Sequence, residues 1–196
     1  MIRNFELFCK LKFIKKPVLS LLQESIDALP SIMSSLSCPL CSAKQGMSLH
    51  SHYERHFIDL NTDGVVVDQI INIPRLICSS CEHTHAYLPA LITPFSSYSL
   101  FFVIQVLRDY FLRTKTVIDI CENYLISCST LYRWLELFRL HKRLWLGELE
   151  NHIQEPLDFM VAIETYTDFL KHFFELCNRS FLQNTPSATL SDHRRY

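Results

Sequence analysis

Two cysteine pairs constrain the fold of this chain more than any other feature of its sequence. The pairs are Cys38-Pro-Leu-Cys41 and Cys78-Ser-Ser-Cys81. A Cys-x-x-Cys turn can aim both thiolates at one metal ion, and two such turns supply the four sulfurs that tetrahedral zinc accepts. We therefore expect Cys38, Cys41, Cys78 and Cys81 to bind one structural Zn²⁺, because a shell of four sulfurs leaves no open position for catalysis. Two disulfides or free structural thiols are the alternative interpretation.

The segment between the pairs has to carry structure of its own. It covers residues 42–77, which is longer than the roughly 15–20 residues of the short zinc pattern. Along 52–60, Tyr53, Arg55, Phe57 and Asp59 alternate with His52, His56, Ile58 and Leu60, as in a strand, and residues 61–64 are Asn-Thr-Asp-Gly, a turn signal. A β-branched run follows over 65–73, and we expect Pro74 to stop it. The sequence therefore predicts a hairpin between two zinc knuckles, which is a zinc ribbon.

Two histidines and four further cysteines have less specific interpretations. His83 and His85 follow the second pair and have the chemistry of spare ligands, hydrogen-bond donors to sulfur or phosphate contacts. We expect them to be surface or packing residues, since histidine is ordinarily partly exposed. The unpaired cysteines are expected to act as small apolar residues; they are Cys9, Cys121, Cys128 and Cys177.

The second half of the chain has the periodicity of helices. A first helix is expected from Tyr98 to Arg113, with Ser96-Ser97 as its N-cap. Apolar residues cover this helix nearly all round, and such a helix is usually buried on more than one side. We therefore expect it to pack against both the ribbon and the later helices.

The next segment has the spacing of a helix-turn-helix. One helix is expected over 116–124 and a second from the N-cap Ser127 to His141, with small Cys121 where the two helices approach. The apolar positions of the motif are Ile120, Tyr124, Ile126, Leu131 and Trp134. Leu125 stands where such turns usually have glycine, because that backbone position often needs a positive φ. We therefore expect a different turn geometry here.

The outward face of the second helix is the candidate nucleic-acid contact. Its outward residues are Cys128, Ser129, Thr130, Tyr132, Arg133 and Glu136. We expect Ser127, Ser129, Thr130, Tyr132 and Arg133 to contact DNA, with Arg133 pairing with guanine or holding a phosphate. Residues 101–145 carry seven basic and four acidic side chains, which favours this interpretation. Any short pair of helices with an apolar seam is the alternative.

The two ends of the chain flank these motifs. Residues 146–180 are acidic, and a helix starting at Pro156 would bury one side against the helical core or against a second copy, giving a homodimer. We interpret its carboxylates as a solvated exterior and not as a catalytic site. The tail, 181–196, is expected to be flexible. Within the N-terminal segment, 1–36, the first 16 residues are expected to form a basic arm; its cationic residues are Arg3, Lys10, Lys12, Lys15 and Lys16, against Glu6.

Composition limits the partners and the compartment. Among 196 residues, 19 basic and 20 acidic side chains give a formal net charge of −1, so nucleic-acid binding has to come from local clusters. The first 16 residues show no cleavage site, and no apolar run approaches the roughly 20 residues that span a membrane. We therefore expect a soluble, cytoplasmic protein with no membrane partner.

Several segments together resemble a known group of proteins. They are Cys38-Pro-Leu-Cys41, Tyr53-Glu-Arg55, the segment from Ile73 to Cys81, Thr84-His-Ala-Tyr-Leu-Pro89 and the segment from Ser127 to Trp134. Their order resembles an uncharacterised bacterial zinc-ribbon and helix-turn-helix family, which is similar to the DNA-binding N-terminal part of insertion-sequence transposases. The resemblance covers about positions 36–145 and implies DNA binding connected with mobile elements.

No transposase catalytic domain is expected in this chain. Such a domain needs three carboxylates on a mixed sheet that hold two divalent metals, and no β-rich run follows Leu100. We therefore expect a module that is not an enzyme and that works beside a separate transposase or recombinase subunit. An adaptor that binds protein through a structural zinc, a transcriptional regulator, and a recombinase fragment that lost its catalytic part are the other hypotheses.

The expected fold class is α+β. The divisions are an N-terminal segment (1–36), a small β-rich four-cysteine zinc ribbon (37–95), an all-α helix-turn-helix region (96–145), a C-terminal amphipathic, acidic helical segment (146–180) and a tail (181–196). The leading functional hypothesis is sequence-specific binding of double-stranded DNA.

Overall fold

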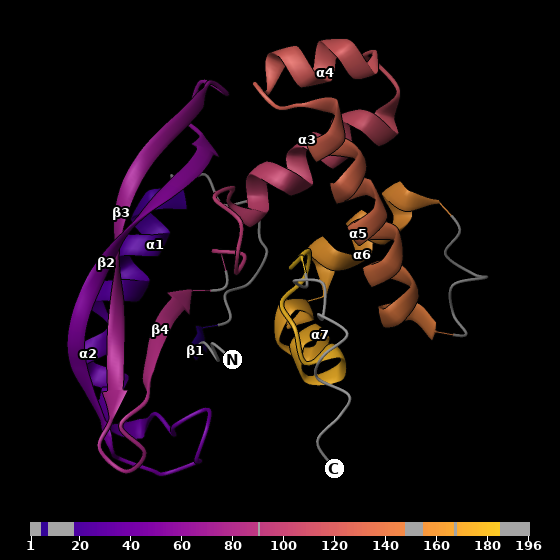
Figure 1. The fold of residues 1–196 in the computed structure, drawn as a ribbon. Coiled ribbons are helices and arrows are strands. Elements are labelled where there is room, and N and C mark those ends of the chain that lie inside the picture. The colour runs from indigo at the N-terminus through magenta and orange to yellow at the C-terminus, as the bar shows by residue number, and fades with distance from the viewer. Residues whose placement is uncertain (1–4, 8–17, 90, 148–154, 167, 185–196) are drawn as a thin grey trace, which may run out of the picture.

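A long sheet and a group of helices lie side by side in the computed structural model, which describes residues 5–7, 18–89, 91–147, 155–166 and 168–184 (Figure 1). The strands are β1 (Phe5–Leu7), β2 (Met47–Leu60), β3 (Val66–Cys78) and β4 (Thr84–Pro89). The helices are α1 (Val18–Asp27), α2 (Leu29–Ile32), the 3₁₀ helix η1 (Met33–Ser35), α3 (Leu100–Leu112), α4 (Val117–Asn123), α5 (Cys128–Leu146), α6 (Pro156–Thr165) and α7 (Phe169–Cys177). The expected α+β class is therefore observed.

The sheet is built around one long hairpin. Its strand order is β1-β4-β3-β2, with β2, β3 and β4 antiparallel and β1 parallel to β4. The hairpin turns where Asn-Thr-Asp-Gly predicts it. The Asn61 side-chain oxygen accepts hydrogen bonds from the backbone of Asp63 and Val65, both at 2.9 Å, and Gly64 supplies a φ of 76°.

Pro74 does not stop β3, contrary to the expectation from sequence. The strand continues to Cys78, and the pairing of β3 with β4 begins only at Arg75. The β2–β3 register shifts between Leu49 and Ser51, which makes His50 an extra residue in β2 opposite this point. A proline costs a strand little beside a bulge, because the ladder there does not need its missing N–H.

The bulge coincides with a change in the buried face of the ribbon. In β3, beside the buried Pro74, the buried residues are Ile71 and Ile73 before this point and Leu76 and Cys78 after it. The first two pack with Phe57 and Leu22, and the last two pack with Met47 and Leu29. Alternation along a strand places odd and even positions on opposite faces, so the two halves of the ribbon bury opposite faces.

The ribbon is joined to α3 through a buried hydrogen-bonded pair. Ser99 is the N-cap of α3, two residues after the expected Ser96-Ser97, and its side chain accepts from the Phe102 N–H. The Ser99 hydroxyl donates to Asp59 Oδ1 at 2.8 Å. Burial raises the pKa of the Asp59 carboxyl, against the lowering effect of this hydrogen bond. As expected, α3 contacts both β2 and the later helices α4, α5 and α6.

The next two helices follow the expected boundaries closely. Thr116 caps α4 in a capping box with Asp119, and Ser127 caps α5 by accepting from the Thr130 N–H. The apolar residues expected at the seam are all buried: Ile120, Cys121, Tyr124, Ile126, Leu131 and Trp134. α5 extends past His141 to Leu146, where Gly147 ends it with a φ of 51°.

The described residues of the C-terminal region form two helices, α6 and α7, and not the single amphipathic helix expected from sequence. The tail also begins later than residue 181, because Phe181 and Leu182 are buried in the helical cluster. The Leu182 N–H donates to Nδ1 of His141 at 2.9 Å, and the His141 ring lies between Phe173 and Phe181. Burial, with a smaller effect from Arg179, lowers the pKa of His141 to about 4.

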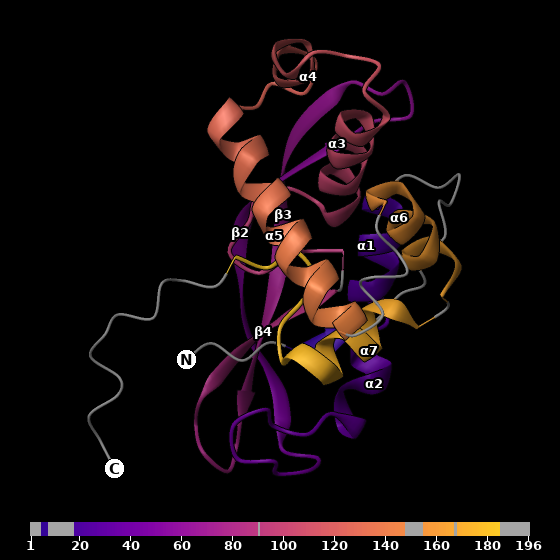
Figure 2. The same ribbon diagram turned by 90° about the vertical axis from the view of Figure 1, so that its right-hand side faces the viewer.

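The hydrophobic interior is divided into separate clusters. The largest belongs to α3–α7, one lies near the cysteine pairs, and one joins α1 to the middle of the sheet. Figure 2 shows α5 crossing in front of the sheet, with α6 and α7 beside it. Within the described residues, no helix has both the length and the apolar composition needed to cross a bilayer. The basic residues expected to form an N-terminal arm lie outside the described residues.

Candidate metal centre and nucleic-acid interface

The four cysteines predicted as ligands come together at one end of the sheet. Their sulfurs all lie within 4.8 Å of one another. The Cys38–Cys81 and Cys41–Cys78 sulfur pairs are each 3.7 Å apart. Four sulfurs placed tetrahedrally at about 2.3 Å from one ion lie roughly 3.8 Å apart. The sulfurs are therefore spaced as a tetrahedral metal site requires.

The two knuckles have the same local backbone geometry. The Ser42 N–H donates to the Cys38 carbonyl at 2.9 Å, and the Glu82 N–H donates to the Cys78 carbonyl at 2.8 Å. The residue after each pair is left-handed, with φ values of 59° at Ser42 and 57° at Glu82. This conformation is uncommon outside glycine. Its repetition at equivalent positions shows that both turns are built to direct their cysteines inward.

The sulfurs perturb one another's ionisation. A hydrogen bond from the Cys81 backbone, opposed by burial, lowers the pKa of Cys78 to about 6. The His83 backbone favours the Cys81 thiolate, but burial and the other three sulfurs outweigh it and raise the pKa of Cys81 to about 12. Four sulfurs this close cannot all be anionic without a cation among them. The donor set therefore fits a soft divalent metal ion.

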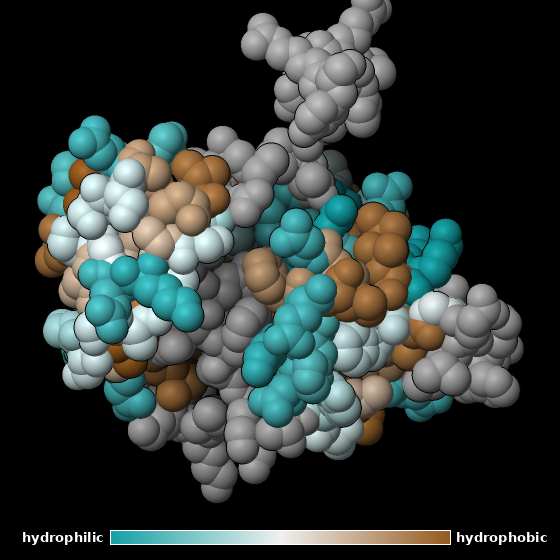
Figure 3. Space-filling model, turned by 90° about the horizontal axis from the view of Figure 1, so that it is seen from below, coloured by the Kyte–Doolittle hydropathy of each residue, from teal (hydrophilic) through white to brown (hydrophobic). Residues whose placement is uncertain are grey.

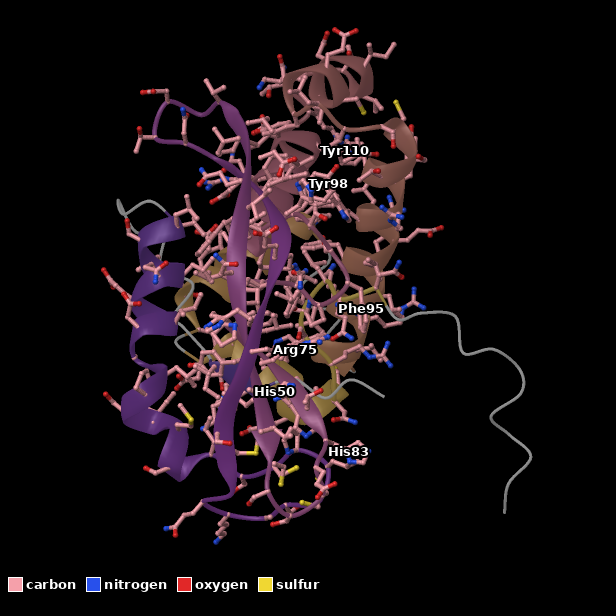
Figure 4. The ribbon with its side chains drawn as sticks, turned by 60° about the vertical axis from the view of Figure 1, so that its left-hand side comes forward. His50, Arg75, His83, Phe95, Tyr98 and Tyr110 are labelled. Carbon is pink, nitrogen blue, oxygen red and sulfur yellow. The ribbon has the colours of Figure 1, made fainter. Side chains whose placement is uncertain are left out.

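The two histidines differ in their relation to the cysteines. His85 is buried, and its Nε2 lies 3.4 Å from the Cys38 sulfur, so it orients a candidate ligand. His83 is exposed, and its Nδ1 lies 2.7 Å from the Cys81 carbonyl oxygen. Figure 4 shows His83 at the sulfur end of the ribbon, with His50 and Arg75 further along it. His85 is thus more than the surface or packing residue expected, because a neighbour of a ligand fixes its orientation.

The predicted contact residues at the start of α5 differ in exposure and in hydrogen bonding. Ser129, Tyr132 and Arg133 are exposed and lie at i, i+3 and i+4, which is one face of a helix. Thr130 is half-buried, and the Ser127 hydroxyl lies 2.8 Å from that of Ser129 and 2.9 Å from that of Thr130. The structure therefore gives Ser127 and Thr130 a capping role and leaves the other three facing solvent.

The opposite face of α5 is fixed in the helical cluster. The Trp134 ring packs edge-on against Tyr98 at 4.9 Å and against Phe102 at 6.2 Å between ring centroids. Phe102 also packs edge-on against Tyr124, whose hydroxyl donates to Asp109 at 3.0 Å. These contacts hold α4 and α5 against α3 and fix the direction of the exposed face.

The turn between α4 and α5 is left-handed at Leu125. Its φ is 51°, and its side chain is 75% exposed. The Ile126 N–H donates to the Cys121 carbonyl and the Leu125 N–H to the Glu122 carbonyl, which is the hydrogen-bond pattern of a Schellman helix end. The expectation of a different turn geometry is therefore wrong, since leucine here adopts the backbone that glycine usually supplies.

A basic hollow lies beside α4. It has a volume of about 450 Å³ and includes Arg113, Lys115 and Arg139 among its lining residues. Lys115 pairs with Asp109 at 3.0 Å. No carboxylate is among the described residues that line this hollow, so Arg113 and Arg139, rather than the paired Lys115, give it a positive character.

Sequence reasoning missed one pair of groups. The sulfurs of Cys121 and Cys128 lie 3.4 Å apart across the turn, although both were interpreted as isolated apolar residues. Two cysteines seven residues apart do not form a recognised sequence motif. The expected helix-turn-helix was the only signal in the sequence that these two positions approach each other.

Comparison with known proteins gives one match. Residues 38–134 match the model of a family described as a domain of unknown function (DUF6431). No curated protein and no solved structure matches the chain. The matched range begins at the first candidate ligand, Cys38, and ends at Trp134 in α5. The chain is therefore similar to this family across both the four sulfurs and the start of α5.

Proposed function

We propose that this protein binds double-stranded DNA in a sequence-specific manner, with α4, its turn and α5 acting as a helix-turn-helix. The observation that carries the proposal is the exposed face of Ser129, Tyr132 and Arg133 on a helix whose other face is anchored by Leu131 and Trp134. A helix held in this way can enter the major groove with its first turns facing base edges.

The chemistry of the exposed face suits this role. Arg133 is exposed and, within the described chain, makes no ion pair, so its guanidinium is available for a guanine edge. The Ser129 hydroxyl and the Tyr132 ring flank it with a hydrogen-bonding group and an aromatic surface. The hollow lined by Arg113 and Arg139 supplies cations for neighbouring phosphates.

We propose that the metal is Zn²⁺ and that its role is structural. Four sulfurs at tetrahedral spacing form a closed shell, and zinc is the ion that such a set ordinarily holds. One pair of ligands precedes β2 and the other lies at the end of β3, so binding one ion would tie the start of β2 to the end of β3. Metal analysis of the purified protein by mass spectrometry should find about one zinc per chain; finding none would refute this part.

The DNA proposal is tested by selecting ligands from a random duplex library with the full-length, metal-loaded protein. Arg133→Ala should leave the fold intact and weaken binding to the selected site by about 1–3 kcal/mol, the usual value of one bidentate base contact. Arg143→Ala is the matched control, because Arg143 is exposed in the last turn of α5. Equal affinities of the wild type and the Arg133 variant would reject α5 as the recognition helix.

Salt dependence gives an independent check. If about four phosphates are neutralised, log affinity should fall with log salt concentration at a slope of about −3.6. A complex that is insensitive to salt would contradict a DNA-binding surface built from arginine and lysine.

The resemblance to transposase N-terminal parts suggests the target. We infer that the site lies at the end of a mobile element and that a separate transposase or recombinase subunit supplies catalysis. Regulation of transcription would use the same surface. A selected sequence that recurs as the two ends of one element would support transposition, whereas a site placed only beside a promoter would support regulation.

A protein-binding adaptor is the second candidate, and one observation favours it. Leu140 and Leu144, at i and i+4 on α5, are each 42% exposed and form a small apolar pair on the surface of the helix. In the view from below, hydrophobic side chains form small groups separated by hydrophilic ones (Figure 3). An adaptor should fail the duplex selection and should lose its partner in the L140E variant, while Arg133→Ala has no effect.

A further inference from the structure

Two thiols meet at the turn between α4 and α5. Cys121 lies in α4, Cys128 is the first residue of α5, and their sulfurs are 3.4 Å apart. Both are free cysteines. Neither belongs to the group of four candidate metal ligands, which is the only such group among the described residues. The pair is therefore a separate chemical feature.

The two thiols differ in their access to solvent. Cys128 is exposed, whereas Cys121 is only 7% exposed and packs in the helical cluster. Burial, and then the neighbouring Cys128 sulfur, raise the pKa of the Cys121 thiol to about 11. A dissolved oxidant therefore reaches Cys128 first, and the neighbouring Cys121 is a protonated thiol. This is the arrangement of an accessible cysteine next to a resolving cysteine.

We propose that Cys121 and Cys128 form a site of reversible disulfide formation, driven by a peroxide and reversed by a dithiol. The Cys128 thiolate attacks one oxygen of hydrogen peroxide, the O–O bond breaks, and Cys128 becomes a sulfenic acid while hydroxide leaves. The Cys121 sulfur then attacks the Cys128 sulfur and displaces its hydroxyl group, which leaves with the Cys121 proton as water. In total, two thiols lose two electrons and two protons, and one peroxide becomes two waters.

The geometry favours a disulfide between these two sulfurs within one chain. The sulfurs need to approach from 3.4 Å to about 2.05 Å across a turn of four residues, 124–127. The resulting ring encloses Leu125, so the disulfide would close the left-handed turn covalently. This inference stands apart from the proposed DNA binding, because it depends only on the two sulfurs.

The test uses the fact that one tryptic peptide, 116–133, contains both cysteines and no other. The metal-loaded full-length protein is treated with increasing hydrogen peroxide, its free thiols are alkylated in denaturant, and the peptides are measured without reduction. We expect peptide 116–133 to lose both alkylation sites together and to weigh two hydrogens less than its unalkylated reduced form. Dithiothreitol should restore both sites. The Cys177 peptide, which carries a partly buried lone thiol, should stay alkylated at the same peroxide dose.

Two variants identify the roles of the sulfurs. In Cys121→Ser, Cys128 should stop at a sulfenic acid that dimedone traps; in Cys128→Ser, Cys121 should stay alkylatable at the same dose. The inference is overturned if the wild-type peptide keeps both free thiols while Cys177 is oxidised, if Cys128 oxidises further without a bond to Cys121, or if the disulfide joins two chains. The wild-type measurement alone decides these outcomes even where a variant folds poorly.

Discussion

The buried His141 should make the helical half of the protein sensitive to acid. Its side chain is 0% exposed, and its pKa is lowered from an ordinary 6.5 to about 4, chiefly by burial. Between these values the unfolded chain binds a proton that the native state does not, so the free energy of unfolding falls as pH falls. At about 1.4 kcal/mol per pH unit, the total loss is about 3 kcal/mol, of which about 2 kcal/mol is already lost at pH 5.

Urea titrations followed by tryptophan fluorescence at pH 7 and pH 5 measure this loss. Both tryptophans report on the helical cluster, where Trp134 is buried and Trp145 packs against Phe169. His141→Asn keeps an acceptor for the Leu182 N–H and removes the titrating group, so its stability should change by about 2 kcal/mol less than that of the wild type. The same substitution at exposed His50 is the control. Identical pH dependence in His141→Asn and the wild type would refute the reasoning.

Three further perturbations have expected outcomes. Cys78→Ser should abolish stoichiometric metal binding and the protection of the ribbon amides in hydrogen exchange, while the tryptophan-detected transition of the helices persists. Asp59→Asn keeps an acceptor for the Ser99 hydroxyl and should raise the free energy of unfolding at pH 7, because it removes a buried negative charge. Since the pKa of Asp59 is raised in the native state, the wild type gains stability as the pH falls, and the advantage of the variant should shrink. An advantage that grows in acid would contradict a buried, charged Asp59. Leu125→Gly should stabilise the protein by about 1 kcal/mol in urea titrations, because glycine adopts a φ of 51° without strain and the lost side chain is 75% exposed. A loss of stability would mean that the contacts of the leucine side chain outweigh its backbone strain.

The sequence was most informative where chemistry fixes spacing. Two Cys-x-x-Cys turns predicted that Cys38 and Cys81 would meet although 42 residues lie between them, because a metal site needs all four sulfurs at one point. The hairpin turn and the cap at Ser127 were also predicted, since each depends on side chains that satisfy nearby backbone groups.

The features that were missed depend on tertiary context. Pro74 looks locally like the end of a strand, but it lies near the bulge in β2 and just before the pairing of β3 with β4 begins, where a missing N–H costs little. Leu125 reads as an unfavourable turn residue, but packing of the helices on both sides holds it left-handed. The approach of Cys121 to Cys128 and the position of His85 beside Cys38 depend on how elements pack, which periodicity does not encode.

The bulge at His50 also limits how the ribbon can change in length. Side chains alternate along a strand, so inserting or deleting one residue turns every later side chain to the opposite face. Met47 and Phe57 are both buried, one on each face of the ribbon, and deleting His50 would turn one of them to the opposite, unburied face. Removing two residues from each strand would instead move the end that carries the four cysteines about 7 Å closer to the helices and leave every remaining side chain on its present face. Natural length variation of this ribbon should therefore occur in even steps.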